Sequence, residues 1–170
     1  MKEQCVMTSP LGTLLLEVDE IGVTMLEFLA ESAPVTSPNE IQSPILKEAI
    51  QWLTRYFSGQ QPVALPPLHL VGTPFQQQVW EMLCTIPYGD TVTYGELAHR
   101  ISASRAGAPM AAQAVGGAVG KNPVPIMVPC HRVVGVKGKL TGYAAGLDKK
   151  VALLKLEGVA LTDDKTSINQ

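Results

Sequence analysis

Apolar and polar residues alternate in the first 28 residues of the chain. Residues 13–18 place Leu14 and Leu16 on one face, and a second short run covers residues 23–28. The sequences Ser9-Pro10-Leu11-Gly12 and Asp19-Glu20-Ile21-Gly22 bound these runs with residues that favour turns. Short alternating runs between such turns are typical of antiparallel strands. We therefore predict a β-sheet within residues 4–28.

A helical spacing of apolar residues follows a polar loop at residues 30–42. Ser43 can cap a helix with Pro44 in its first turn, and apolar residues then recur through Phe57 to a glycine at position 59. Residues 60–68 are rich in proline and predict an extended linker. Residues 1–70 are thus expected to form an N-terminal α/β domain.

The remaining chain predicts a second, mostly helical domain at residues 71–160, followed by a tail at residues 161–170. The predicted helices begin after Thr73, after Thr93 and at Pro109, and a last helix covers residues 147–156 before Gly158. Two short helices joined by a turn are similar to a helix-turn-helix. The predicted fold class is α+β.

Composition limits the compartment in which the protein works. No apolar run approaches the ~18–20 residues of a membrane span. The first five residues lack the apolar segment of a signal peptide. Three cysteines at unrelated spacings argue against a disulfide framework and for a reducing compartment. We expect an intracellular monomer without a membrane partner, in the nucleus if the source is eukaryotic and in the cytoplasm if it is prokaryotic.

Charge is distributed unevenly along the chain. Residues 1–90 carry three Lys and Arg against ten carboxylates, whereas residues 91–155 carry nine against two and residues 156–170 one against three. A basic segment of this kind favours a polyanionic partner.

The stretch from Asn122 to Gly135 carries the strongest chemical signal. Pro123, Pro125 and Pro129 restrict the backbone, and the intervening residues are mostly apolar. The polar sequence Cys130-His131-Arg132 follows this stiff approach. A cysteine beside a histidine is a candidate nucleophile, and a buried structural cysteine is the alternative interpretation.

This stretch resembles the active-site motif of the O6-alkylguanine-DNA alkyltransferases. Other blocks are similar to that family in the same order: Thr73-Pro74-Phe75-Gln76, Ile86-Pro87-Tyr88-Gly89, Thr93-Tyr94-Gly95-Glu96-Leu97, Ala114-Val115-Gly116-Gly117, Thr141-Gly142-Tyr143-Ala144-Ala145-Gly146 and Leu153-Leu154-Lys155-Leu156-Glu157-Gly158. The resemblance covers residues 72–158 well and residues 1–28 more loosely. It implies an N-terminal domain of ribonuclease-H-like topology and a C-terminal, winged-helix-like, DNA-binding domain.

The resemblance also implies a reaction, in which an alkyl group moves from O6-alkylguanine in double-stranded DNA, and by extension O4-alkylthymine, to Cys130. His131 would take the thiol proton, with a water between them, because a thiolate is the nucleophile. Glu157 would hold the His131 tautomer, as acids do in other triads. Asn122 resembles the hinge asparagine that ties the turns around the cysteine. The thioether product offers water no carbonyl, so each protein would act once.

Other positions are expected to bind the substrate or the DNA. Tyr94 would donate its hydroxyl to the guanine ring, and Val119, Val133, Tyr143 and Ala144 would shape the pocket. The base must leave the duplex to reach this pocket. The residues expected to contact DNA are Arg105, Ala112, Gln113, Ala114 and Arg132.

Two departures from the family pattern bear on function. Gln113 stands where the family usually has the arginine that fills the gap left by the flipped base, and a carboxamide lacks the charge and stacking of a guanidinium. Arg105 lies in a longer turn nearby. Cys5, Asp19, Thr24 and His69 correspond to a zinc site of some relatives, but structural zinc prefers four Cys or His ligands. We expect no metal and no cofactor.

Three alternatives to this function remain from the sequence. The first is a lesion-binding protein that flips alkylguanine without transfer, although relatives of that kind lack the cysteine present here. The second is a variant with low DNA affinity that acts mainly on free O6-substituted guanines. The third is a thiol hydrolase built on Cys130, His131 and Glu157, which would turn over an ester.

Overall fold

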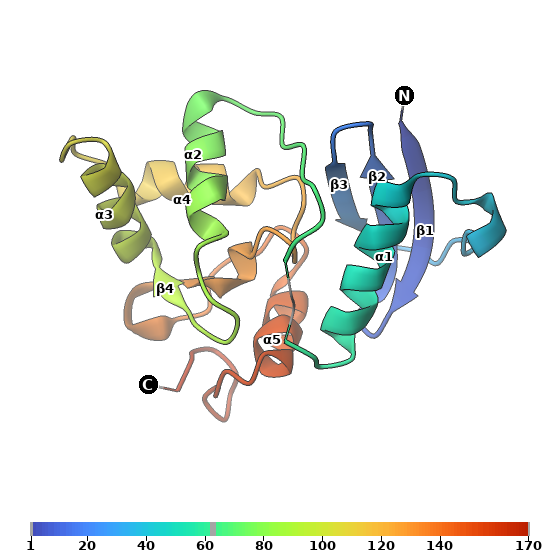
Figure 1. The fold of residues 1–170 in the computed structure, drawn as a ribbon. Helices are drawn as coiled ribbons and strands as arrows, with labels where there is room; N and C mark the ends of the chain where they lie inside the picture. The colour runs from blue at the N-terminus through green and yellow to red at the C-terminus, as the bar shows by residue number, and fades with distance from the viewer. Residues whose placement is uncertain (1, 62–63, 170) are drawn as a thin grey trace. The chain divides into compact units, whose positions relative to one another are not determined.

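The computed structural model describes residues 2–61 and 64–169. Pro62 and Val63, within the predicted linker, and the two terminal residues lie outside the described part. The chain divides into two compact units, Met1–Val71 and Gly72–Gln170, and each is described by itself. The α+β prediction is confirmed, because the first unit holds a three-stranded sheet and the second is mostly helical (Figure 1).

Unit 1 is a three-stranded antiparallel sheet with one helix packed on it (Figure 1). The strands β1 (Glu3–Ser9), β2 (Gly12–Val18) and β3 (Val23–Phe28) pair in chain order. The helix α1 (Pro44–Phe57) begins where predicted, and the Ser43 hydroxyl accepts a hydrogen bond of 3.2 Å from the Leu46 N–H. The alternating pattern is confirmed, since Leu14 and Leu16 of β2 are fully buried.

The last residues of unit 1 extend the sheet beside β3. The Val23 N–H donates to the Pro67 carbonyl at 2.8 Å, and the His69 N–H donates to the Val23 carbonyl at 2.9 Å. The His69 ring contacts the Asp19 carboxylate, and the pKa of Asp19 is lowered to about 2, first by a backbone hydrogen bond from Gly22 and also by His69. Among the described residues no three His, Cys, Asp or Glu side chains come together as metal ligands.

Three helices form the first part of unit 2: α2 (Pro74–Leu83), α3 (Tyr94–Ser104) and α4 (Ala112–Gly120). α4 packs against both α2 and α3, and the Trp80 indole N–H donates to the Ala118 carbonyl at 2.9 Å. α4 begins at Ala112, three residues later than the predicted start at Pro109. Ala111 has extended backbone angles, so Pro109 belongs to the preceding turn and not to the helix.

The rest of unit 2 places the Cys130 segment between these helices and the last helix. A two-stranded parallel sheet pairs β4 (Val92–Thr93) with β5 (Val133–Val134). The 3₁₀ turns η2 (Cys130–Arg132) and η3 (Val136–Gly138) flank β5, and α5 (Leu147–Leu156) has the predicted bounds. Helices with a small sheet and a loop at its edge agree with a winged-helix-like arrangement. No helix in the described part of the chain is long and apolar enough to cross a membrane.

Candidate active site

The approach to Cys130 is a compact buried loop tied by one asparagine. The Asn122 side-chain amide donates to the Val128 carbonyl at 2.8 Å, and its oxygen accepts from the Val124 N–H at 3.0 Å. The Val128 N–H also donates to the Val124 carbonyl at 3.0 Å. These bonds close the turn between residues 122 and 128. The backbone from the turn to Cys130 therefore has a defined direction.

Ile126, inside this turn, has a backbone φ of 75°. A β-branched residue in the left-handed region is strained, and strain of this kind persists only where the surroundings hold it. Ile126 is buried, and the Asn122 and Val128 bonds enclose it. Packing and hydrogen bonds therefore hold Ile126 in a backbone conformation that a β-branched residue disfavours.

Cys130 is the first residue of η2 and is buried, with 8% of its surface exposed. Burial raises the pKa of its thiol, because desolvation disfavours the thiolate. Four contributions act in the opposite direction: the Asn122 and Tyr143 side chains, the positive charge of Lys150 and the backbone of Cys130 itself. The site thus surrounds a desolvated thiol with donors and a cation that stabilise its ionised form.

His131, directly after Cys130, is fully buried and contacts Glu157 at the end of α5. The distance from His131 Nε2 to Glu157 Oε2 is 2.6 Å. Burial lowers the pKa of His131, and Glu157 opposes this effect only in part. A neutral imidazole that donates its Nε2 proton to the carboxylate carries a lone pair on Nδ1. The geometry therefore provides a buried, neutral base next to the thiol.

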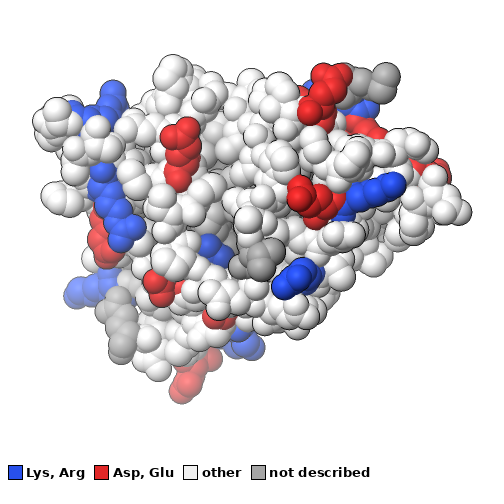
Figure 2. All heavy atoms as spheres, viewed as in Figure 1, with Lys and Arg blue, Asp and Glu red and all other residues white. Residues whose placement is uncertain are grey.

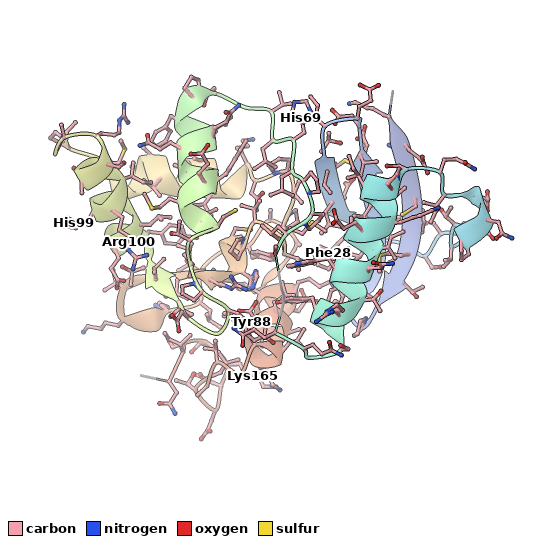
Figure 3. All side chains as sticks on the ribbon, in the orientation of Figure 1. Phe28, His69, Tyr88, His99, Arg100 and Lys165 are labelled. Carbon is pink, nitrogen blue, oxygen red and sulfur yellow. The ribbon has the colours of Figure 1, made fainter. Side chains whose placement is uncertain are left out.

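Arg132 completes a three-residue cluster with His131 and Glu157. Its Nε donates to Glu157 Oε1 at 2.8 Å and a terminal nitrogen donates to Oε2 at 3.0 Å, a bidentate ion pair. The other terminal nitrogen donates to the Ile86 carbonyl at 2.7 Å. Its guanidinium also lies 5.8 Å from the ring centroid of Tyr88, which Figure 3 labels. This geometry contradicts the expected contact between Arg132 and DNA, because the guanidinium is buried and engaged within the protein.

Lys150 is a functional candidate that the sequence interpretation missed. The side chain is fully buried, and its Nζ donates to the Val133 carbonyl at 2.6 Å and to the Thr141 carbonyl at 3.3 Å. Burial lowers its pKa to about 8, while the nearby Cys130 opposes that change. Helical phase was the available signal: Lys150 lies three and four residues before the buried Leu153 and Leu154, on the same face of α5.

The expected substrate-binding residues lie on four segments: α3, α4, β5 and the loop that precedes α5. Tyr94 starts α3, and its hydroxyl hydrogen-bonds the side chain of Thr141. Burial is the main reason that the pKa of Tyr94 is raised, which keeps its hydroxyl protonated as a donor. The Tyr143 side chain lies close enough to the Cys130 thiol to lower its pKa. Of the other three, Val119 and Val133 are buried and Ala144 is exposed.

The exposed face of α4 carries the residues expected to contact DNA. Ala112, Gln113 and Ala114 are all exposed in its first turn, and α4 holds no charged residue. Arg105 caps the end of α3, with its guanidinium 5.9 Å from the ring centroid of Phe75. The structure leaves the roles of these residues as predictions, but it does expose three small or neutral side chains in the first turn of α4.

The basic character of residues 91–155 is weaker at the surface than the sequence count indicated. Of the nine Lys and Arg in residues 91–155, Arg132 and Lys150 are buried, which leaves seven that reach the surface at least in part. Figure 2 shows Lys and Arg side chains along the α3 side of this unit, and Figure 3 labels Arg100 on that helix. An excess of surface cations over Glu96 and Asp148 remains.

Comparison with known families divides the chain in a similar way. Residues 5–70 match the profile described as 6-O-methylguanine DNA methyltransferase, ribonuclease-like domain. Residues 74–159 match the profile described as 6-O-methylguanine DNA methyltransferase, DNA binding domain.

Several characterised proteins are similar over most of their length. A methylated-DNA–protein-cysteine methyltransferase of Methanosarcina acetivorans is 45% identical over 152 residues, which cover 88% of this chain and 94% of the relative. A protein of the same name from Mycobacterium bovis is 45% identical, with 88% of each chain covered. The crystal structure of Mycobacterium tuberculosis OGT in complex with DNA superposes with a TM-score of 0.75 at 45% identity, covering 89% of this chain and 90% of that one.

Proposed function

The chain belongs to the 6-O-methylguanine DNA methyltransferase family, and from this premise we propose how its residues carry out the reaction. The protein is a methylated-DNA–protein-cysteine methyltransferase that repairs DNA by direct transfer of an alkyl group to the protein. We propose that Cys130 accepts the alkyl group and that O6-alkylguanine in duplex DNA is the substrate. We also propose that the protein is a monomer and acts in the cellular compartment that contains the DNA.

The observation that carries this assignment is the buried cluster at Cys130. A thiolate must form in a site that excludes water, and the thiol lies among two hydrogen-bond donors and a buried ammonium group. The adjacent His131 has its Nε2 engaged by Glu157 at 2.6 Å, which favours the tautomer with its lone pair on Nδ1. His131 accepts the thiol proton, directly or through one water molecule.

Arg132 defines the protonation state of the triad in this proposal. Its bidentate pair with Glu157 favours the ionised carboxylate. An ionised Glu157 can only accept hydrogen bonds, so it holds the proton of His131 on Nε2. Glu157 also accepts from the Gly89 N–H at 3.0 Å, which fixes the carboxylate from a third direction. Arg132 and Glu157 are positioning residues, whereas Cys130 and His131 are the groups that react.

The transfer step forms one bond and breaks one bond. The Cys130 sulfur attacks the alkyl carbon in line, a C–S bond forms, and the bond between that carbon and guanine O6 breaks with its electron pair on the base. The Tyr94 hydroxyl donates a proton to the leaving guanine and neutralises it. Solvent then returns a proton to Tyr94 and takes the thiol proton from His131. The product is a thioether, which has no carbonyl for water to attack. Each molecule therefore repairs one lesion, and no metal or cofactor takes part in these steps.

The alkylated base reaches this site when its nucleotide is flipped out of the duplex. α4 supports this part of the proposal, because its exposed first turn consists of Ala112, Gln113 and Ala114. Small side chains allow a helix to approach the DNA backbone closely. Gln113 can hydrogen-bond the base on the opposite strand that was paired with the flipped guanine. O4-alkylthymine presents a similar alkyl oxygen and is proposed as a second substrate.

Intact mass spectrometry after incubation with an O6-methylguanine oligonucleotide tests the assignment directly. The wild-type protein should gain the mass of one methyl group on Cys130, and Cys130→Ser should gain none. The two other cysteines are the internal controls: Cys5 is buried, and burial raises its pKa to about 11, while Cys84 is surface-exposed. A methyl group on either of them would contradict the proposal, and binding without any mass gain would indicate a lesion-binding protein.

A further inference from the structure

Residues 160–169 form a hairpin that packs on the rest of unit 2. The Thr162 N–H donates to the Ser167 carbonyl at 2.9 Å and the Asn169 N–H donates to the Ala160 carbonyl at 2.7 Å. Leu161 and Ile168 form an antiparallel bridge. We name residues 160–169 the C-terminal hairpin; the sequence analysis had assigned residues 161–170 to a tail. Figure 3 labels Lys165, which lies in its turn.

One aspartate closes the turn of the C-terminal hairpin. Asp164 Oδ1 accepts from the Thr162 hydroxyl at 2.7 Å, from the Thr166 hydroxyl at 2.8 Å and from the Thr166 N–H at 3.1 Å. The Lys165 backbone has a φ of 58°, and its N–H donates to the Thr162 carbonyl at 2.8 Å. The turn therefore has its own hydrogen-bond network and a defined conformation.

The C-terminal hairpin pairs with the segment that leads out of η3. The Leu140 N–H donates to the Thr166 carbonyl at 2.8 Å, and the Ile168 N–H donates to the Gly138 carbonyl at 2.9 Å. Lys139 and Ser167 form an antiparallel bridge between these two bonds. The second strand of the hairpin thus pairs with residues 138–140. This pairing provides hydrogen-bond partners for the backbone groups of both segments.

Apolar side chains attach the same hairpin to the helix and strand beside the active site. Leu161 and Ile168 pack against a buried cluster made of Val134, Leu140 and Leu154. Val134 is in β5, four residues after Cys130, and Leu154 is in α5, one turn after Lys150. The packing links the hairpin to both elements that carry the chemistry.

The segment that the C-terminal hairpin holds runs directly into the wall of the thiol site. Thr141 follows Leu140, and its carbonyl accepts from Lys150 Nζ at 3.3 Å while its side chain hydrogen-bonds the Tyr94 hydroxyl. The side chain of Tyr143, two residues later, lies close enough to the Cys130 thiol to lower its pKa. Three groups of the proposed mechanism therefore depend on where residues 141–143 lie.

We propose that the C-terminal hairpin is a positioning element for alkyl transfer, acting through Leu140 on the loop that contacts Tyr94, Lys150 and Cys130. This inference rests on the proposed function. Its physical reason is that Thr141 and Tyr143 lie in a loop, where backbone freedom is large unless neighbouring strands restrict it. The hairpin supplies this restriction from a part of the chain that contributes no group to the reaction.

The test compares four proteins: wild type, a truncation after Ala160, Ile168→Asp and Ile168→Val. Ile21→Asp is the matched control, since Ile21 is 60% exposed and lies in unit 1. Thioether formation is followed by intact mass with free O6-benzylguanine, which needs no DNA, at saturating concentration. DNA affinity is measured with the Cys130→Ser form of each protein. Hydrogen exchange reports the Leu140 amide, which Thr166 protects.

The truncation and Ile168→Asp should each slow transfer to the free base by about tenfold or more, because small displacements of reacting groups are costly. Ile168→Val and Ile21→Asp should stay within about twofold of wild type, since neither change detaches the hairpin. DNA affinity should change less than the transfer rate, and exchange at Leu140 should accelerate only where the hairpin is detached.

Three outcomes would overturn the inference. Folded truncated and Ile168→Asp proteins that transfer at the wild-type rate would show that the loop holds its position alone. Equal losses in transfer and in DNA affinity would show a general structural effect. If the truncated chain does not fold, the Ile168→Asp protein is the test of the inference. If that variant also fails to fold, a role of the hairpin confined to positioning is excluded. A wild-type protein that gains no mass from an O6-methylguanine oligonucleotide would instead remove the proposed function itself.

Discussion

Lys150 Nζ lies 2.6 Å from the backbone carbonyl oxygen of Val133, three residues after Cys130. This contact fixes a buried ammonium group beside the segment that carries the thiol. The charge of Lys150 lowers the pKa of Cys130, and Cys130 in turn raises that of Lys150. The two groups form a coupled pair inside a site that burial would otherwise keep neutral.

Replacement of Lys150 by methionine should slow transfer to a free O6-substituted guanine by about tenfold or more, because the buried charge that favours the thiolate is lost. Methionine retains much of the lysine stem, so packing within α5 changes little. Lys149→Met is the matched control on the next residue, which is half-buried and pairs with Asp148 at 3.2 Å. Equal rates for the two variants would exclude an electrostatic role for Lys150.

The buried lysine should also give the stability a pH dependence of known sign. The pKa of Lys150 is lowered from 10.5 to about 8 on folding, so between these values the unfolded chain binds more protons than the folded one. The free energy of unfolding should therefore rise with pH in that window, by roughly 3 kcal/mol in total, since one pKa unit corresponds to about 1.4 kcal/mol. Below pH 8 this burial penalty is present in full.

The measurement is chemical denaturation of Cys130→Ser and of Cys130→Ser with Lys150→Met, from pH 7.5 to 10.5. The serine removes the Cys130 titration, whose pKa is raised and whose effect on stability has the opposite sign. The difference between the two proteins isolates Lys150. A difference that stays constant with pH would show that the ammonium group is not desolvated.

Glu157→Gln should slow transfer much more than it weakens DNA binding, because it changes the His131 tautomer and no DNA contact. It should also destabilise unit 2 by roughly 3–5 kcal/mol, because it leaves the Arg132 guanidinium buried without its carboxylate. The transfer rate, the DNA affinity of the Cys130→Ser form and the unfolding free energy are measured together.

A double variant separates the two effects of Glu157. Glu157→Gln with Arg132→Met removes both charges of the buried pair, so much of the lost stability should return. The transfer rate should remain low, since the carboxylate that accepts from His131 is still missing. Recovery of transfer together with stability would mean that Glu157 only maintains the fold.

DNA affinity should depend strongly on salt, because the surface cations of unit 2 contact phosphates and release counterions. Lys137→Ala, in the exposed η3 turn, should reduce the slope of log affinity against log salt by about one. Lys47→Ala in unit 1 should leave the slope unchanged. A flat salt dependence of the wild-type protein would contradict a DNA-binding role for residues 91–155.

Gln113→Arg should accelerate repair of duplex DNA while scarcely changing the reaction with a free O6-substituted guanine. Flipping costs a few kcal/mol, and a guanidinium can offset part of it by charge and stacking. A gain of ~1 kcal/mol would correspond to about fivefold. Gln113 is exposed on α4 and is absent from the Cys130 cluster, so the chemistry itself should not change.

Gln113→Met is the matched control, since it has similar length without a donor or a charge. It should repair duplex DNA more slowly than wild type and react with the free base equally well. An unchanged duplex rate in Gln113→Arg would indicate that Arg105 or another group already fills the gap. Gln113→Arg combined with Arg105→Ala would then identify that group.

The sequence by itself predicted the first sheet, most of the helices and the residues that we propose to react. Local rules sufficed for α1, which begins at the Ser43 cap and Pro44, and for α5, whose bounds were predicted. Alternation placed Leu14 and Leu16 in the core of the first sheet. The motif that contains Cys130, His131 and Asn122 lies within a few residues, so the sequence was enough to predict these positions as site residues.

Only the tertiary structure decided which charges belong to the surface and which to the site. Arg132 and Lys150 look like solvated cations in a basic segment, but the fold buries both against Glu157 and the Val133 carbonyl. Likewise, residues after Gly158 carry no strong pattern, yet they pair with residues 138–140. Burial and strand pairing depend on contacts between residues far apart in the chain, and no local pattern records those contacts.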